Sequence, residues 1–132
     1  PEWNRGSYLV GILGHCGECH TPRNIFGAIK PRYAYAGTKH GPGGEKIPNI
    51  TPDQETGIGD WAQNDVTWLL QTGFLPDGDV VGSSMADVVE HSTSHLTAGD
   101  QSAIAIYLKS LTPIYNQMPT KKGPAEDNIN NW

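Results

Sequence analysis

The spacing of apolar residues predicts a mainly α-helical chain whose best-defined helix lies towards the C-terminus. There, apolar positions recur at i, i+3, i+4 and i+7, at Ile104, Tyr107, Leu108 and Leu111. Thr97, followed three residues later by Asp100, is typical of a capping box, and Pro113 ends the apolar pattern. We therefore expect a helix over about residues 97–111.

Three further helices are predicted by the same spacing, over residues 4–15, 60–73 and about 86–94. Their apolar stripes are Leu9, Ile12 and Leu13; Ala62, Val66, Leu69 and Leu70; and Val88 and Val89. Asp60 and Gly73 suit the start and the stop of the second of these helices. No strand pattern is found.

The remaining segments are predicted to be irregular. Five prolines and a Gly-Pro-Gly-Gly run break residues 21–59. A structureless stretch of this length is unusual in a compact domain, but it is reasonable where a loop surrounds a large cofactor. Residues 112–132 are polar and contain proline, which predicts a surface tail. We therefore assign residues 1–111 to one domain and residues 112–132 to a C-terminal tail.

Composition narrows the class of protein. The chain has 132 residues, enough for one domain, and only 36% of them are hydrophobic, so its core is lean. A formal charge of −5 argues against nucleic acid as the main partner, and no apolar run approaches the ~20 residues of a membrane span. The chain begins at Pro1 without an initiator Met, which indicates a processed or excised piece.

The charges are segregated along the chain. No acidic residue lies between Cys19 and Gly44, and the basic residues of that stretch are Arg23, Lys30, Arg32 and Lys39. No Lys or Arg lies between Ile47 and Leu108, where nine acidic residues fall. If the two stretches occupy different faces, the molecule has a strong dipole, and the basic stretch is expected to recruit an acidic partner. The alternative is an ordinary solvated surface.

The main chemical signature is Cys16-Gly17-Glu18-Cys19-His20, the C-x-x-C-H form of c-type haem attachment. Residues i, i+3 and i+4 share one face of a helical turn, so two thiols can add to the haem vinyl groups while the imidazole reaches the iron. The same two cysteines are also compatible with a redox disulfide or half a zinc site. A thioredoxin-like redox disulfide would require a βαβ pattern, which the sequence does not show. A zinc site would require a second pair of ligands at finger-like spacing, which the sequence also does not show.

An electron-carrying haem needs a second axial ligand, and methionine favours this function. The two candidates are Met85, in a Gly-Ser-Ser-Met-Ala segment before the last helix, and Met118, in the tail. We favour Met85, because a ligand must be held between packed elements. A bis-His centre would use His40, His91 or His95 instead. Some carbonyl group must orient the other nitrogen of His20, and the Pro-rich loop through Pro31 is a candidate source.

The sequence resembles the class I c-type cytochromes, and more narrowly one haem domain of the cytochrome c subunit of membrane-bound quinoprotein alcohol dehydrogenases and related periplasmic dehydrogenases. The matching motifs are WNRGSYLV (3–10), GHCGECHTPRN (14–24), NITPD (49–53), TGIGDW (56–61), MADVVEHS (85–92) and IAIYLKSL (104–111). The resemblance implies a fold in which the N- and C-terminal helices cross, with Gly6 and Tyr107 at their contact and long loops around a covalent haem. Such subunits carry three haem motifs and a membrane anchor, whereas this chain has one motif.

The resemblance also implies a cofactor site. Cys16 and Cys19 would anchor one haem c, with His20 and Met85 as iron ligands. The remaining residues expected near the haem edge are Asn49, Ile50, Thr51 and Trp61. Among these, the Trp61 Nε1–H and the Thr51 hydroxyl are candidate donors to a haem propionate. The alternative roles are core packing for Trp61 and turn formation for Thr51.

The function expected from this resemblance is electron transfer, not catalysis. The donor would be a periplasmic dehydrogenase, and the acceptor quinone, a terminal oxidase or another cytochrome. The expected location is the periplasm, with any membrane association supplied by a parent chain or a partner. Two alternatives belong to other classes: a haem enzyme or gas sensor with an open sixth position, and a binding module with a structural disulfide between Cys16 and Cys19.

Overall fold

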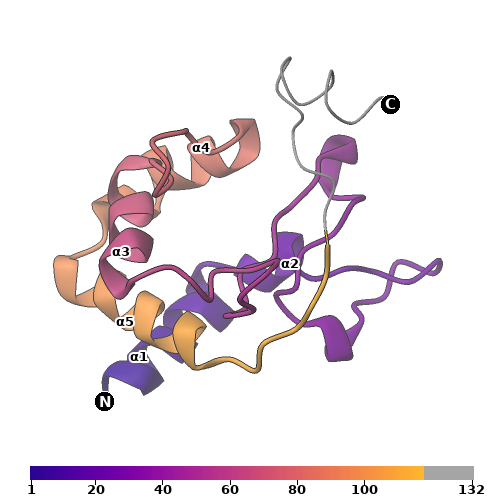
Figure 1. Ribbon diagram of the computed structural model, residues 1–132, viewed down its shortest axis with the longest axis horizontal. Helices are drawn as coiled ribbons and strands as arrows, with labels where there is room; N and C mark the ends of the chain where they lie inside the picture. Colours follow the sequence, from indigo (N-terminus) through magenta and orange to yellow (C-terminus); the bar gives the residue numbers. More distant parts are fainter. Residues whose placement is uncertain (118–132) are drawn as a thin grey trace.

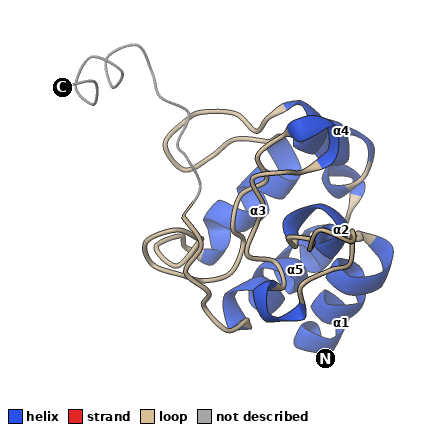
Figure 2. Ribbon diagram, turned by 90° about the vertical axis from the view of Figure 1, so that its right-hand side faces the viewer, coloured by secondary structure: helices blue, strands red, loops and turns tan. Residues whose placement is uncertain are grey.

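The computed structural model describes residues 1–117, without the side chains of Pro42 and Ser83. Its α-helices are α1 (Glu2–Tyr8), α2 (Cys16–His20), α3 (Gln63–Thr72), α4 (Ser83–His91) and α5 (Ala98–Ser110). A π-helical segment, η1 (Leu9–Leu13), follows α1, and three short 3₁₀ turns are η2 (Pro31–Tyr33), η3 (Pro42–Gly44) and η4 (Thr93–His95). Over residues 1–117 there are isolated β-bridges but no strand (Figures 1 and 2). The predicted mainly α-helical fold is therefore confirmed.

The predicted N-terminal helix is divided in the structure. α1 continues directly into η1, which ends at Leu13. His15 then adopts a left-handed conformation (φ 51°, ψ 33°), which turns the chain before α2 begins at Cys16. A left-handed conformation is uncommon for a residue other than glycine. The haem-motif helix is thus a separate element, oriented independently of the helix before it.

The other helices lie close to their predicted positions. α3 begins at Gln63 rather than Asp60, and the Asp65 carboxylate accepts from the Ala62 N–H (2.8 Å) at its start. α4 begins at Ser83, three residues earlier than predicted. α5 begins with the predicted cap, in which the Asp100 N–H donates to the Thr97 hydroxyl (3.1 Å).

The N- and C-terminal helices pack closely. A Cβ atom placed on Gly6 would lie 2.1 Å from the Ala103 carbonyl oxygen and 2.7 Å from Tyr107 Cβ, so only glycine fits at this contact. Trp3 meets the Tyr107 ring edge-to-face at 5.2 Å and donates to the Ser110 hydroxyl (2.7 Å). The expected contact through Gly6 and Tyr107 is therefore present.

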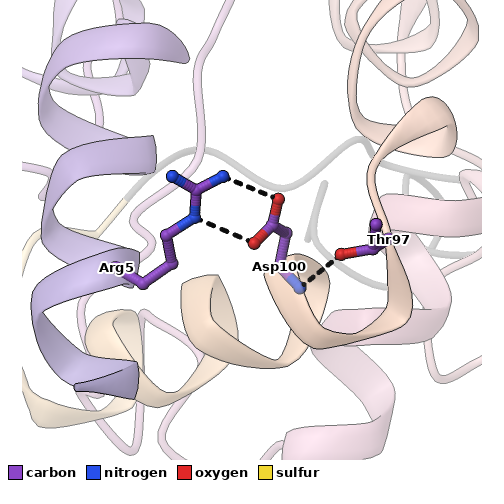
Figure 3. Close-up of polar contacts among 3 residues, drawn as sticks. All are labelled: Arg5, Thr97 and Asp100. Atoms are coloured by element: carbon purple, nitrogen blue, oxygen red, sulfur yellow. Dashed lines mark hydrogen bonds and ion pairs between the residues drawn. The ribbon is translucent and has the colours of Figure 1, made fainter.

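An ion pair links α1 to α5 (Figure 3). Arg5 donates to both carboxylate oxygens of Asp100, at 2.9 and 3.0 Å. The capping box predicted at Asp100 is therefore half formed: its backbone N–H is capped by Thr97, while its carboxylate bonds to α1 instead of back to the cap.

The core lies between α1, η1, α3 and α5. Its buried members are Leu9, Val10, Ile58, Val66, Leu70, Ile104, Ala105 and Leu108. Ile58 is contributed by the long loop, so the loop closes one side of this core. None of the described helices is long and apolar enough to cross a membrane.

The first part of the predicted tail is bonded to the long loop. The Ile114 N–H donates to Thr51 Oγ1 (3.1 Å), and the Asn116 side chain donates to the carbonyl oxygens of Ala36 (3.0 Å) and Gly37 (3.2 Å). Residues 112–117 therefore hold the loop in place. The rest of the predicted tail, including Met118, lies outside the described residues.

Candidate haem site

The C-x-x-C-H motif forms a helix of its own, α2, as its spacing predicts. Cys16 and Cys19 are both free thiols and both half-buried, so the structure contains no disulfide between them. Burial raises the pKa of Cys16 to about 11, which keeps its thiol neutral at ordinary pH. Two free thiols one helical turn apart match the chemistry of addition to two vinyl groups.

His20 is oriented by the backbone of the long loop. Its ring is buried, and its Nδ1 lies 2.8 Å from the Pro48 carbonyl oxygen. A carbonyl oxygen can only accept, so Nδ1 carries the proton and Nε2 carries the lone pair. Burial lowers the pKa of His20, which favours this neutral form. His20 is therefore held in the tautomer in which Nε2 can bind a metal.

The orienting carbonyl belongs to Pro48, which lies further along the Pro-rich loop that passes through Pro31; the sequence did not indicate which residue of the loop supplies it. Gly37 brings this part of the loop to α2. Its N–H donates to the His20 carbonyl oxygen (2.6 Å), and its φ is +85°. A Cβ on Gly37 would lie 2.5 Å from the Ile47 carbonyl oxygen and 2.6 Å from the Pro48 carbonyl carbon. Gly37 is thus a residue on which the site depends, and nothing in the local sequence distinguishes it from other loop glycines.

Asn49 and Thr51 form a buried network with residues 112–117. The Thr51 hydroxyl donates to Asn49 Oδ1 (2.7 Å) and accepts from the Ile114 N–H (3.1 Å), while Asn49 Nδ2 donates to the Ile114 carbonyl oxygen (2.6 Å). The single hydroxyl proton of Thr51 is therefore already used within the protein. This geometry favours a scaffolding role for Thr51 over the expected donation to a propionate.

Trp61 and Ile50 are half-buried and pack against the core. Among the hydrogen bonds of residues 1–117 none involves Trp61 Nε1, so this N–H is open to solvent or to a ligand. The turn before Trp61 is fixed by Lys109, whose ammonium donates to the carbonyl oxygens of Ile58 (3.0 Å), Gly59 (3.0 Å) and Trp61 (2.7 Å). The sequence did not indicate this role, because a lysine in a helix is ordinarily a solvated residue.

Met85 lies in the first turn of α4 and is half-buried. The sequence placed it in a loop before the helix, so the segment is more ordered than predicted. Among the alternative ligands, His40, His91 and His95 are exposed, and a ring nitrogen of His95 is engaged with the Glu90 carbonyl oxygen (2.8 Å). The assignment of Met85 as the distal ligand stays a prediction.

These residues fit haem c. One helix carries two free thiols and a buried imidazole in the metal-binding tautomer, and the indole N–H of half-buried Trp61 has no acceptor among the described residues. Together with the packed terminal helices, this arrangement defines a class I c-type cytochrome.

Comparison with known proteins confirms the class. The chain is 48% identical over 114 residues to a dihaem cytochrome c-type protein of Cereibacter sphaeroides, 44% identical over 110 residues to the fructose dehydrogenase cytochrome subunit of Gluconobacter japonicus, and 40% identical over 119 residues to the cytochrome c subunit of a quinone alcohol dehydrogenase of Gluconobacter oxydans. These matches cover 86%, 83% and 86% of the chain. No protein-family model matches it.

The resemblance to a haem domain of dehydrogenase cytochrome subunits is thereby confirmed. The chain spans only 37%, 22% and 25% of the lengths of these three relatives, so it corresponds to one segment of each. The first of these relatives is named as a c-type cytochrome, and the other two as cytochrome subunits of dehydrogenases. Cytochrome c relatives imply haem c as the cofactor.

Proposed function

We propose that this chain is an electron carrier with a single covalently bound haem c. The observation that carries the proposal is the hydrogen bond between His20 Nδ1 and the Pro48 carbonyl oxygen (2.8 Å), on the helix that bears both free thiols. It leaves His20 Nε2 as a ready axial ligand. A redox disulfide or a structural disulfide would have no need of an imidazole held in this way.

Each residue has a defined task in this proposal. Cys16 and Cys19 would hold the group in thioether linkage, and His20 and Met85 would ligate its iron. When bound, haem c accepts and releases one electron at a time. Trp61 Nε1–H donates to a propionate. The Pro48 carbonyl would hold the His20 ring in one orientation, since it belongs to the backbone rather than to a mobile side chain.

The electron donor is proposed to be a dehydrogenase, and the acceptor quinone, a terminal oxidase or another cytochrome. The support lies in the names of the relatives, which are subunits of fructose, alcohol and gluconate dehydrogenases. A periplasmic location is part of the same proposal.

Whether Met85 ligates the iron distinguishes an electron carrier from a haem enzyme or gas sensor with an open sixth position. Met85→Ala should abolish the long-wavelength sulfur-to-iron band of the ferric protein, lower the midpoint potential and allow carbon monoxide to bind the ferrous protein. Met118→Ala is the matched control and should leave all three properties unchanged. The ligand assignment is wrong if the two results are exchanged. Ready binding of carbon monoxide by the unmodified protein would instead support the alternative with an open sixth position.

A further inference from the structure

Two adjacent large apolar side chains stand almost completely in solvent at the tip of one loop. Ile25 is 95% exposed and Phe26 is 88% exposed, whereas the other large exposed apolar side chains of the described residues do not pass 58%. The loop that carries them leaves α2 and returns at η2, and it projects from the right-hand side of the molecule in Figure 1. Apolar surface placed in this way indicates a contact with something outside the chain.

The tip is built as a rigid hairpin. The Asn24 side-chain oxygen accepts from the N–H groups of Phe26 (2.9 Å) and Ala28 (3.1 Å), and the Asn24 N–H donates to the Ala28 carbonyl oxygen (2.8 Å). Arg23 adds a hydrogen bond to the Gly27 carbonyl oxygen (2.8 Å). The apolar side chains are therefore presented in a fixed position, which reduces the entropy lost when they are buried in a contact.

The segment that carries the tip is cationic along the sequence. Lys30, Arg32 and Lys39 follow the hairpin and are all exposed, and no acidic residue lies between Cys19 and Gly44. Arg23 is paired with Glu18 (3.0 Å), whereas within residues 1–117 no ion pair involves the three later residues. The positive charge of this stretch is opposite in sign to the net charge of the whole chain, which is −5.

We propose that this hairpin, residues 23–29, is a membrane-contact site that inserts Ile25 and Phe26 into the interfacial region of an anionic lipid bilayer. Exposed apolar side chains flanked by Lys and Arg are the combination that such an interface attracts. A stable protein partner would require about 800 Å² of complementary surface on each side, whereas shallow insertion requires only a small protruding tip. The lipid surface is therefore the occupant that the observed features favour.

The site would also have a consequence for electron transfer, which rests on the proposed function. Cys19 precedes the hairpin by only four residues. Seating the hairpin on a bilayer would hold the haem-bearing α2 next to the membrane, where a lipid-soluble quinone acceptor is found.

The test is co-sedimentation of the purified haem-loaded protein with vesicles made of equal parts phosphatidylglycerol and phosphatidylethanolamine. Ile25→Ser with Phe26→Ser should lower the partition coefficient by about tenfold or more at all salt concentrations, because the lost interaction is apolar. Lys30→Glu with Arg32→Glu should lower it strongly at low salt, and the deficit should shrink as salt is added. Vesicles of phosphatidylcholine should bind the unmodified protein weakly.

Two control variants keep the test decisive. Ile25→Leu with Phe26→Leu retains the apolar tip and should bind almost as well as the unmodified protein. Val80→Ser removes an apolar side chain that is 57% exposed within the acidic stretch, and it should have no effect. All variants should keep the haem spectrum and midpoint potential of the unmodified protein. A failure of the unmodified protein to bind haem would count against the proposed function, and not against the membrane proposal. The membrane proposal is overturned if the unmodified protein does not sediment, or if the serine variant binds as well as the leucine variant. It is equally overturned if the tip is needed only for reduction by a soluble protein.

Discussion

Replacing Gly6 by alanine should separate the two terminal helices. The new Cβ would lie 2.1 Å from the Ala103 carbonyl oxygen, 2.8 Å from its carbonyl carbon and 2.7 Å from Tyr107 Cβ. Two of these atoms belong to the backbone of α5 and the third is directly attached to it, so no rotamer change can relieve the clash. The helices must therefore move apart by roughly the missing 1 Å, which weakens dispersion contacts along the whole interface.

The expected change in the free energy of unfolding is the sum of two opposing effects. Overpacking destabilises a protein by about 1–3 kcal/mol, and the upper end applies where backbone must move. Alanine in place of glycine stabilises a helix by about 1 kcal/mol. We therefore expect Gly6→Ala to lower the free energy of unfolding by about 2 kcal/mol. The matched control is Gly11→Ala, because a Cβ at Gly11 meets nothing within 4 Å.

The assay is guanidinium-induced unfolding of the haem-loaded protein, followed by far-ultraviolet circular dichroism. The control should be as stable as the unmodified protein or slightly more stable, so the two alanine variants should differ by about 3 kcal/mol. Equal stabilities for Gly6→Ala and Gly11→Ala would show that α1 and α5 are not held in the close contact described above.

Three further predictions concern single residues. Lys109→Met should lower the free energy of unfolding by about 2 kcal/mol, since three carbonyl groups lose a charged donor, whereas Lys46→Met on the exposed loop should change it little. Gly37→Ala combines a left-handed φ with a backbone clash, and should reduce the yield of haem-loaded protein measured by absorbance per mole of chain. Arg5 lowers the pKa of Asp100 through their hydrogen bonds, so the pair stabilises the fold above the ordinary aspartate pKa and loses its effect as the pH falls through the lowered value. The stability difference between the unmodified protein and Arg5→Gln, measured by denaturant unfolding against pH, should therefore disappear in acid.

Local sequence patterns predicted the elements whose structure depends on neighbouring residues. The C-x-x-C-H spacing predicted one helical turn with three functional side chains, and Thr97 predicted the start of α5. In both cases the information lies within a few residues of the feature. The contact position of Gly6 came instead from the resemblance to class I c-type cytochromes.

The parts that the sequence did not predict depend on contacts between distant residues. The carbonyl that orients His20 lies 28 residues away, and Lys109 reaches Ile58 across 51 residues. The Thr51 hydroxyl was expected to face a ligand, but it bonds to Asn49 and to Ile114, a residue assigned to the tail. Such partners follow from the path of a long loop, which composition and periodicity do not determine.

Covalent attachment of one haem c to this chain can be measured by intact-protein mass spectrometry after expression with the c-type maturation machinery. We expect a product that is heavier than the chain by one haem and is unchanged by acid–acetone extraction. This product should be absent when Cys16 and Cys19 are both replaced by alanine. A chain without added mass, or a haem that acid–acetone removes, would contradict the claim.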